Sequence, residues 1–211
     1  MKKSFSKILK GYGEFRNKYA SGHESIMHTL AKQGQKPDIM VVSCCDSRVD
    51  PALILNCAPG DLFVVRNVAN IVPPYEKDNF HHGTSAALEF GICMLKVKHL
   101  VLLGHSGCGG IRALLGIDNI QDNDFITNWV SLIKTDNHHH EDFDEFAKTA
   151  LHKSYSNCLT FPWIVEKLKN NELVIHLWFF DIDSGQIFTY SDKHKTYIAL
   201  ESEENEEEIV S

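Results

Sequence analysis

Two short apolar runs, far apart in the sequence, each stop abruptly at residues that can bind a metal ion. The first ends at Cys44, in Val-Val-Ser-Cys-Cys-Asp-Ser-Arg (41–48), and the second ends at His105, in Leu-Leu-Gly-His-Ser-Gly-Cys-Gly-Gly (102–110). In a parallel sheet, chemical groups are presented at the carboxyl ends of the strands. The two runs therefore predict an α/β fold with both motifs at one edge of the sheet.

The rest of the chain alternates between strand-like and helix-like segments, as an α/β fold requires. Five segments are expected to form strands, the last two as a hairpin: 39–43, 62–65, 101–103, 173–180 and 186–190. Helices are expected from Pro51, after Gly109-Gly110, and in 25–32, 82–96, 125–134, 141–152 and 161–169. We predict one domain over residues 1–211, with a mainly parallel central sheet of four to five strands flanked by helices.

Residues 1–34 are expected to form a helical arm. Apolar residues recur there at three- and four-residue steps and give one side an apolar stripe: Phe5, Ile8, Leu9, Tyr12, Phe15 and Tyr19. Such a stripe needs a partner surface. It belongs either to an ordinary core helix or to an arm that lies on another subunit, and its spacing alone does not separate the two.

Composition narrows the classes of function. A formal net charge of -7 without a basic stripe argues against a nucleic-acid partner. No stretch approaches the roughly 18 apolar residues of a membrane span, so we expect a soluble, cytoplasmic protein. Six cysteines are too sparse for a disulfide scaffold and fit reduced thiols. The acidic tail, 201–211, is expected to be solvated and disordered.

The chemistry at the strand ends indicates a catalytic metal. A soft divalent ion such as zinc would bind Cys44, His105 and Cys108, and a set of three protein ligands leaves the fourth position open for water. Bound hydroxide would then act as a nucleophile near neutral pH. Asp46 is expected to hold that hydroxide through its proton, while Arg48 fixes the carboxylate. Without Arg48, Asp46 could swing onto the metal and close the site.

These motifs resemble those of the β-class carbonic anhydrases. The resemblance rests on the C-x-D-S-R motif at 44–48 and the H-x-x-C motif at 105–108, and it extends through 63–70 and 72–74. It implies one zinc ion on Cys44, His105 and Cys108, an Asp46–Arg48 pair, and reversible hydration of carbon dioxide to bicarbonate and a proton. It also implies a homodimer as the minimal unit, or a tetramer or larger assembly, with N-terminal helices that embrace the partner.

The resemblance is closer to the plant-type branch than to the bicarbonate-regulated bacterial branch. The regulated branch has a Trp three residues before the first zinc cysteine, where this chain has Val41. By position, the following residues resemble the plant-type substrate pocket: Gln35, Phe63, Val68, Phe90 and Gly109. Some plant-type relatives have Tyr and His where this chain has Phe90 and Met94, so the route of the proton stays open.

Two other functions compete with carbon dioxide hydration. A hydrolase on the same scaffold would take a related small molecule such as carbon disulfide, and a zinc or thiol-redox protein would use Cys44, Cys45 and Cys108 without catalysis. Other candidate groups have simpler interpretations. We expect Cys57, Cys93 and Cys158 in the core, the histidines at 138–140 in a solvated loop, and His81-His82 at a helix start rather than in a proton relay.

Overall fold

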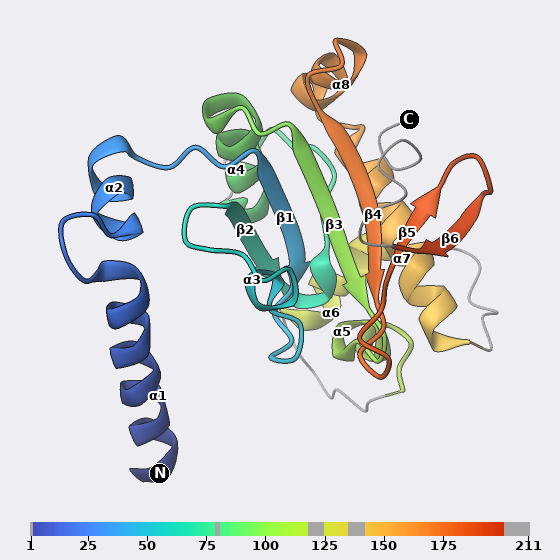
Figure 1. Cartoon of the computed structure of the whole chain (residues 1–211). Coiled ribbons are helices and arrows are strands. Elements are labelled where there is room, and N and C mark those ends of the chain that lie inside the picture. The colour runs from blue at the N-terminus through green and yellow to red at the C-terminus, as the bar shows by residue number, and fades with distance from the viewer. Residues whose placement is uncertain (1, 79–80, 118–124, 135–141, 201–211) are drawn as a thin grey trace.

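The computed structural model describes residues 2–78, 81–117, 125–134 and 142–200. Its centre is a six-stranded sheet of order β2-β1-β3-β4-β5-β6, in which the first four strands pair in parallel and the β4–β5 and β5–β6 pairs are antiparallel (Figure 1). In chain order the strands are β1 Ile39–Cys44, β2 Leu62–Asn67, β3 His99–His105, β4 Val174–Phe180, β5 Ile187–Ser191 and β6 Thr196–Ala199. The predicted mainly parallel α/β fold is confirmed.

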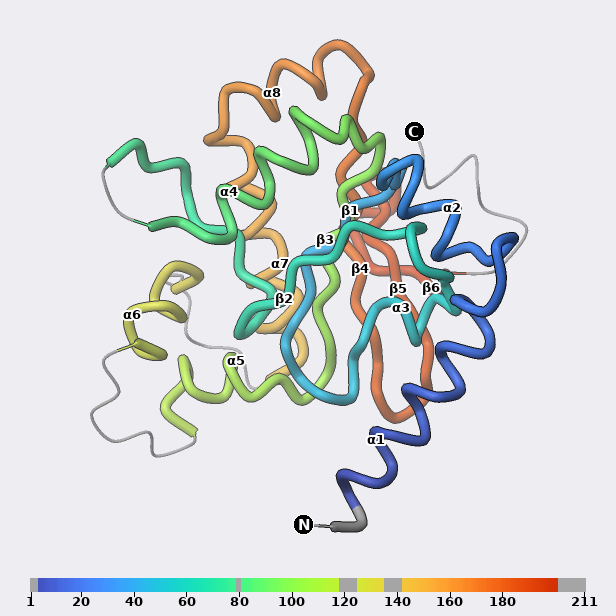
Figure 2. The backbone as a smooth tube through the Cα atoms, turned by 90° about the vertical axis from the view of Figure 1, so that its left-hand side faces the viewer, coloured from blue at the N-terminus to red at the C-terminus, as the bar shows by residue number. Residues whose placement is uncertain are grey.

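Helices lie on both sides of this sheet. Seen edge-on, α4 to α8 lie on one side, and α3 lies on the other side with the N-terminal helices (Figure 2). The longer helices are α1 Lys2–Phe15, α2 Ile26–Gln33, α4 Gly83–Glu89, α7 Phe143–Cys158 and α8 Pro162–Lys169, and the short ones are α3 Pro51–Ile54, α5 Gly109–Leu114 and α6 Ile126–Val130. Short 3₁₀ or π turns complete the set: η1 Arg16–Ala20, η2 Val68–Asn70, η3 Phe90–Leu95 and η4 Ser131–Ile133. Within the described ranges, no helix is both long and apolar enough to cross a membrane.

The central strands are buried because apolar residues cover both of their faces, as parallel sheets require. In β1, Met40 and Val42 belong to the main core under α4 and α7, whereas Val41 faces the opposite side with Val101 and Leu103. All five are at most 2% exposed. This burial fixes the register of β1 and β3 and thus the positions of the residues that follow them.

The structure differs from the predicted elements at the ends of helices and at one edge of the sheet. The short edge strand β6 was not predicted, and α7 runs on to Cys158 rather than stopping at residue 152. The predicted helix at 82–96 is α4 followed by the π turn η3. The histidines at 138–140 and the tail at 201–211 lie outside the described residues.

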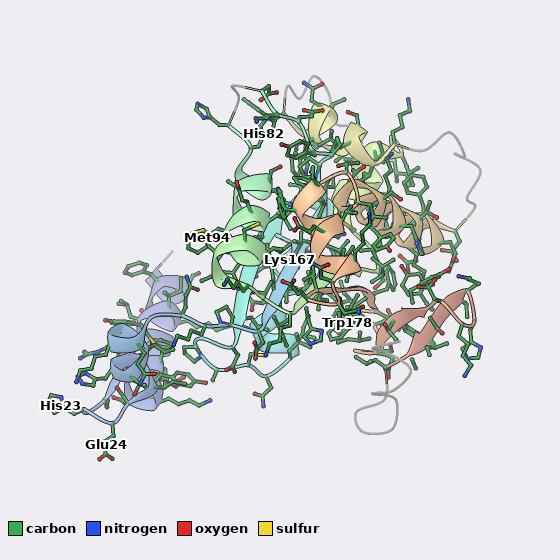
Figure 3. All side chains as sticks on the ribbon, turned by 90° about the horizontal axis from the view of Figure 1, so that it is seen from above. His23, Glu24, His82, Met94, Lys167 and Trp178 are labelled. Atoms are coloured by element: carbon green, nitrogen blue, oxygen red, sulfur yellow. The ribbon has the colours of Figure 1, made fainter. Side chains whose placement is uncertain are left out.

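The N-terminal arm stands apart from the sheet. Helix α1 extends away from it in two perpendicular views, and the turn that carries His23 and Glu24 lies at the periphery (Figures 1–3). The apolar stripe is exposed: Phe5 is 63%, Ile8 66%, Leu9 56% and Tyr12 60% exposed. Of the two interpretations of this stripe, the core helix is therefore wrong for the isolated chain.

Candidate metal centre

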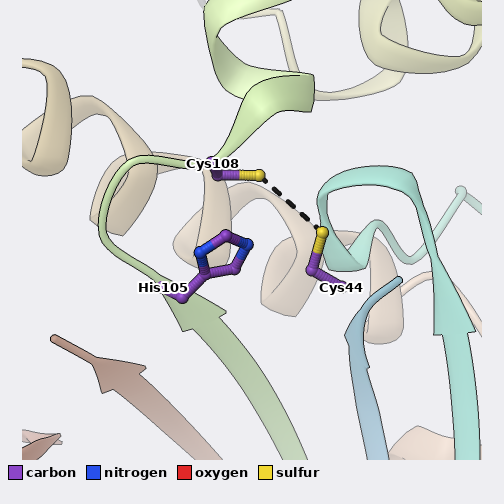
Figure 4. Close-up of side chains that lie close together, drawn as sticks. All are labelled: Cys44, His105 and Cys108. Carbon is purple, nitrogen blue, oxygen red and sulfur yellow. Dashed lines mark hydrogen bonds between the residues drawn. The ribbon is translucent and has the colours of Figure 1, made fainter. Parts of the chain in front are cut away.

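The register of the sheet brings the two sequence motifs together. Ser43 of β1 pairs with Leu103 of β3, so Cys44 and His105 end adjacent strands at nearly the same level. The chain then turns, and Cys108 precedes the first residue of α5. The three ligand atoms lie within 4.8 Å of one another, and the two Sγ atoms are 3.9 Å apart (Figure 4).

The donor atoms fit a soft metal ion. All three residues are buried, and His105 Nδ1 lies 2.9 Å from the carbonyl oxygen of Ser106, which suits donation by an Nδ1–H tautomer. That tautomer leaves Nε2 with a lone pair. Nε2 is buried, and the described residues give it no hydrogen-bond partner. A buried nitrogen without a partner is costly, and a zinc ion held by two thiolates and this nitrogen would remove the cost.

The two thiols differ in acidity because they lie side by side. A hydrogen bond from Cys108 lowers the pKa of Cys44 to about 4, against the effect of its burial and with help from His105. The same contact, together with burial, raises the pKa of Cys108. A divalent cation would let both thiols ionise.

Asp46 and Arg48 form the charged pair beside this cluster. Arg48 Nε donates to Asp46 Oδ1 at 3.0 Å and Nη2 donates to Oδ2 at 2.7 Å, while the backbone N–H of Arg48 also donates to Oδ1 at 2.9 Å. These hydrogen bonds hold the pKa of Asp46 well below its usual range. Three donors use both oxygens of the carboxylate and turn it toward Arg48.

Arg66 is a residue of this site whose role the sequence did not reveal. It projects from β2 and donates to the carbonyl oxygens of Cys44 (3.0 Å) and Asp46 (2.7 Å). Its third contact is an ion pair with Asp50 at 2.8 Å, and Asp50 in turn caps α3 through Ala52 N. Arg66 therefore links β2 to the turn that contains Asp46.

Hydrogen bonds to residues outside the motifs also hold the connection between His105 and Cys108 in place. Ser106 Oγ donates to Asp181 Oδ1 at 3.2 Å and accepts from Ile182 N at 2.9 Å. The N–H of Gly107 donates to Asp144 Oδ1, at the start of α7, at 3.1 Å. Asp181 and Asp144 both lie outside the sequence motifs. Their contacts with this connection depend on how distant segments pack, so the motifs could not reveal them.

Only two of the five predicted pocket residues lie near the cysteines in a single chain. Val68 begins η2, directly after β2, and Gly109 begins α5. The two segments touch, because a Cβ added to Gly110 would come within 2.7 Å of Val68 Cγ1.

The other three pocket residues lie toward the opposite ends of the strands. Gln35 is exposed and precedes β1, and Phe63 pairs with Met40 near the start of that strand. Phe90 packs on Phe63, with ring centroids 5.9 Å apart, and is 44% exposed. At about 3.3 Å per residue, Phe63 lies roughly 13 Å along β2 from its carboxyl end. One chain does not bring these three residues to the cysteines.

The remaining candidates behave as structural groups. Cys158 is fully buried, and burial raises its pKa to about 12. Cys57 and Cys93 are only partly buried, so their assignment to the core was wrong. His82 directly precedes α4, which confirms the predicted helix start, and its Nε2 bonds to Asp78 at 2.7 Å.

The fold and the site together define a class of protein. A mainly parallel sheet presents two thiols and an imidazole at its carboxyl edge, with a carboxylate–guanidinium pair beside them. Three buried soft donors are too few for a closed structural zinc site, which has four protein ligands. The arrangement is that of a metalloenzyme of the α/β class.

Comparison with known proteins identifies the family. The family model described as carbonic anhydrase matches residues 39–187. A carbonic anhydrase of Synechocystis sp. is 31% identical over 94% of this chain and 76% of its own length, and β carbonic anhydrase 3 of Arabidopsis thaliana is 34% identical over 90% and 78%. The chain belongs to the carbonic anhydrase family and, by these relatives, to its β class. Carbonic anhydrases are lyases, and the chain is a lyase of this family.

Solved structures agree with this assignment. The β-carbonic anhydrase CcaA superposes with a TM-score of 0.85 at 32% identity, over 95% of this chain and 94% of that chain. A tetrameric β-carbonic anhydrase from Sordaria macrospora gives a TM-score of 0.73 at 30% identity, over 88% and 94%. The predicted resemblance is confirmed at the level of family and fold.

Proposed function

We propose that the chain binds one zinc ion through Cys44, His105 and Cys108 and uses it for the reversible hydration of carbon dioxide to bicarbonate and a proton. The observation that carries this proposal is the convergence of two thiols with a buried imidazole nitrogen that has no partner among the described residues, beside the Asp46–Arg48 pair. When bound, zinc would lower the pKa of a water molecule so that a strong nucleophile exists near neutral pH.

The protein's own residues orient that nucleophile. Asp46 Oδ2 accepts one hydrogen bond from Arg48, so its second lone pair can accept from the O–H of the attacking water and aim the water's oxygen at the carbon of the substrate. Arg48 keeps Asp46 in this role, because two side-chain hydrogen bonds and one backbone hydrogen bond hold the carboxylate toward the guanidinium. Arg66 holds the carbonyl groups on either side of the same turn. Together they keep the carboxylate from becoming a fourth metal ligand.

A second copy of the chain completes the pocket. Gln35, Phe63 and Phe90 are exposed or partly exposed and lie away from the cysteines of their own chain. The arm carries a further exposed apolar stripe. A homodimer in which the arm lies on the partner would cover this stripe and would bring an amide donor and apolar walls to the neighbouring site. Such a pocket suits a small uncharged gas.

Stopped-flow measurement of carbon dioxide hydration by the zinc-loaded protein tests the proposal. We expect rapid hydration, and loss of it in Cys44→Ser, which removes a metal ligand. Cys45→Ser is the matched control, since Cys45 is exposed and is not part of the metal cluster. Carbon disulfide is offered in parallel. Turnover of carbon disulfide without carbon dioxide hydration would overturn the proposed substrate.

A further inference from the structure

The two residues between His105 and Cys108 determine how these candidate ligands face each other. Ser106 is fixed through its side chain by the loop after β4. Gly107 has no side chain, is exposed, and has a φ of +63°, in the left-handed region that favours glycine. Its N–H belongs to the Ser106–Gly107 peptide and its carbonyl to the Gly107–Cys108 peptide, so the orientations of these two peptide groups depend on what each bonds to.

Both groups of Gly107 have partners from outside this connection. Its N–H donates to Asp144 Oδ1 at 3.1 Å, and its carbonyl oxygen accepts from Arg48 Nη2 at 3.4 Å. One residue thus links α7 to the guanidinium that holds Asp46. The bond to Asp144 has a charged acceptor, which makes it the stronger kind of hydrogen bond, and the bond from Arg48 is the longer of the two.

Asp144 is itself held in place by the start of α7. Its backbone N–H donates to Asp142 Oδ1 at 2.9 Å, which is the capping bond of this helix. A carboxylate in the first turn also lies at the favourable end of the helix dipole. The side chain that reaches Gly107 therefore projects from a fixed backbone.

We propose that Asp144 is a positioning residue of the carbonic anhydrase site: its carboxylate orients the Gly107 peptide, and through it the Arg48–Asp46 pair. The inference rests on the proposed function for its effect on catalysis, but not for the hydrogen bond itself. Asp144 lies outside both motifs and touches no reacting atom. Its loss lets the Ser106–Gly107 peptide rotate, which changes the backbone angles of Gly107 and moves its carbonyl oxygen away from Arg48, so that Arg48 loses its third acceptor.

The experiment compares Asp144→Ala, Asp144→Asn and Glu145→Ala. Asp144→Asn keeps an oxygen acceptor, and Glu145→Ala removes an acidic side chain from the same helical turn without touching Gly107. The full-length protein is analysed by amide hydrogen exchange of the segment that contains Gly107, by zinc content and by carbon dioxide hydration kinetics.

We expect Asp144→Ala to speed exchange at Gly107 and to lower kcat about 10-fold with zinc still bound, the scale reported for outer-shell partners of metal sites. Asp144→Asn should restore most of the activity, and Glu145→Ala should behave like the unmodified protein. In an Arg48→Ala background, Asp144→Ala should have less than about twofold further effect, because it acts through Arg48.

Three outcomes would overturn the inference: unchanged exchange at Gly107 in Asp144→Ala, an equal loss of kcat in Glu145→Ala, or independent effects of Asp144→Ala and Arg48→Ala. Failure of the proposed function is distinguishable. In that case the unmodified zinc protein shows no hydration activity, while hydrogen exchange still reports the Asp144 bond.

Discussion

The carboxyl ends of the central strands and the N-terminal arm differ in whether their side chains find partners in the same chain. At the strand ends, Asp46, Arg48 and Arg66 are bonded to groups of the same chain. Along the arm, the apolar side chains of α1 are mostly exposed, and neither η1 nor α2 contains a buried residue.

This contrast separates the parts of the protein that one chain completes from the part that needs a second surface. The metal cluster and its charged pair need long-range packing, and the sheet supplies it. The arm has an apolar side of the kind that is normally buried, yet the described part of its own chain leaves that side in solvent. We therefore expect variants at the strand ends to abolish chemistry and variants of the arm to abolish assembly.

The largest effect is expected from removing a metal ligand. Cys44→Ser and Cys108→Ser should each lose stoichiometric zinc, since the loss of a direct ligand costs more than the roughly 10–100-fold lost with an outer partner. Cys45→Ser should retain one zinc per chain. Metal analysis of the purified proteins makes the comparison, and full zinc in both ligand variants would show the assignment to be wrong.

Arg48→Ala should remove most of the activity while zinc stays bound. Asp46 would lose two hydrogen bonds and be free to ligate the metal or to lose its orientation, and we expect a fall of about 100-fold in kcat, comparable to removing one preorganised donor. Hydration kinetics and zinc analysis on the same sample test this. A crystal structure of the unmodified protein near neutral pH with Asp46 bound directly to zinc would contradict the prediction that Arg48 holds Asp46 away from the metal.

Deleting residues 1–20 tests the arm. The deletion removes the exposed stripe and leaves the described contacts of the metal cluster intact, so the assembly should dissociate or lose stability. Size-exclusion chromatography with light scattering gives the mass, and thermal unfolding gives the stability. An oligomer of unchanged size and stability would mean that the arm does not hold the subunits together.

Heterodimers show whether the pocket is shared between subunits. Gln35→Ala should lower activity about 10-fold or more by removing a donor, and Cys44→Ser should be inactive. A heterodimer of these two chains contains one site with an intact Cys44 facing an intact Gln35, so about half of the unmodified activity should return. Activity no higher than that of the Gln35→Ala homodimer would place Gln35 with its own chain's metal.

Local signals in the sequence sufficed to predict that Cys44, His105 and Cys108 cluster in the fold. Cys44 and His105 follow apolar runs, Cys108 is three residues further on, and parallel strands align their carboxyl ends. The roles of Arg66 and Asp144 could not be predicted in this way. Asp144 is one of 28 acidic residues, and its bond to Gly107 exists only because α7 packs beside the end of β3.

The errors in the predicted fold have similar physical causes. Strand β6 has four residues, both of its end residues are exposed, and it pairs with β5 alone, so it carries little hydrophobic pattern. Helix α7 continues past residue 152 because Ser154, Asn157 and Cys158 are buried against the rest of the core. Polar residues at buried helical positions hide the periodicity on which such predictions depend.

An effect on stability alone, without a change in the chemistry of the site, is expected at the amino ends of the same strands. His176 of β4 is 8% exposed, and its Nε2 lies 3.1 Å from Nδ1 of His99, the first residue of β3. Burial, followed by the charge of His99, lowers the pKa of His176 from 6.5 to about 4. Between pH 6.5 and about 4, His176 therefore binds a proton in the unfolded chain but not in the folded chain. The stability of the fold falls as the pH is lowered through this window.

Chemical unfolding at several pH values measures this contribution. In the unmodified protein, the loss of stability that comes from His176 should be absent above pH 6.5 and should reach about 3 kcal/mol at pH 4. This is an upper value because the imidazole is not wholly desolvated. His176→Gln should flatten this part of the pH profile. His152, whose pKa is also lowered by burial, acts in the same direction and remains in both proteins. Profiles that stay parallel from pH 6.5 to 4 would mean that His176 accepts a proton in the folded protein as readily as in the unfolded chain.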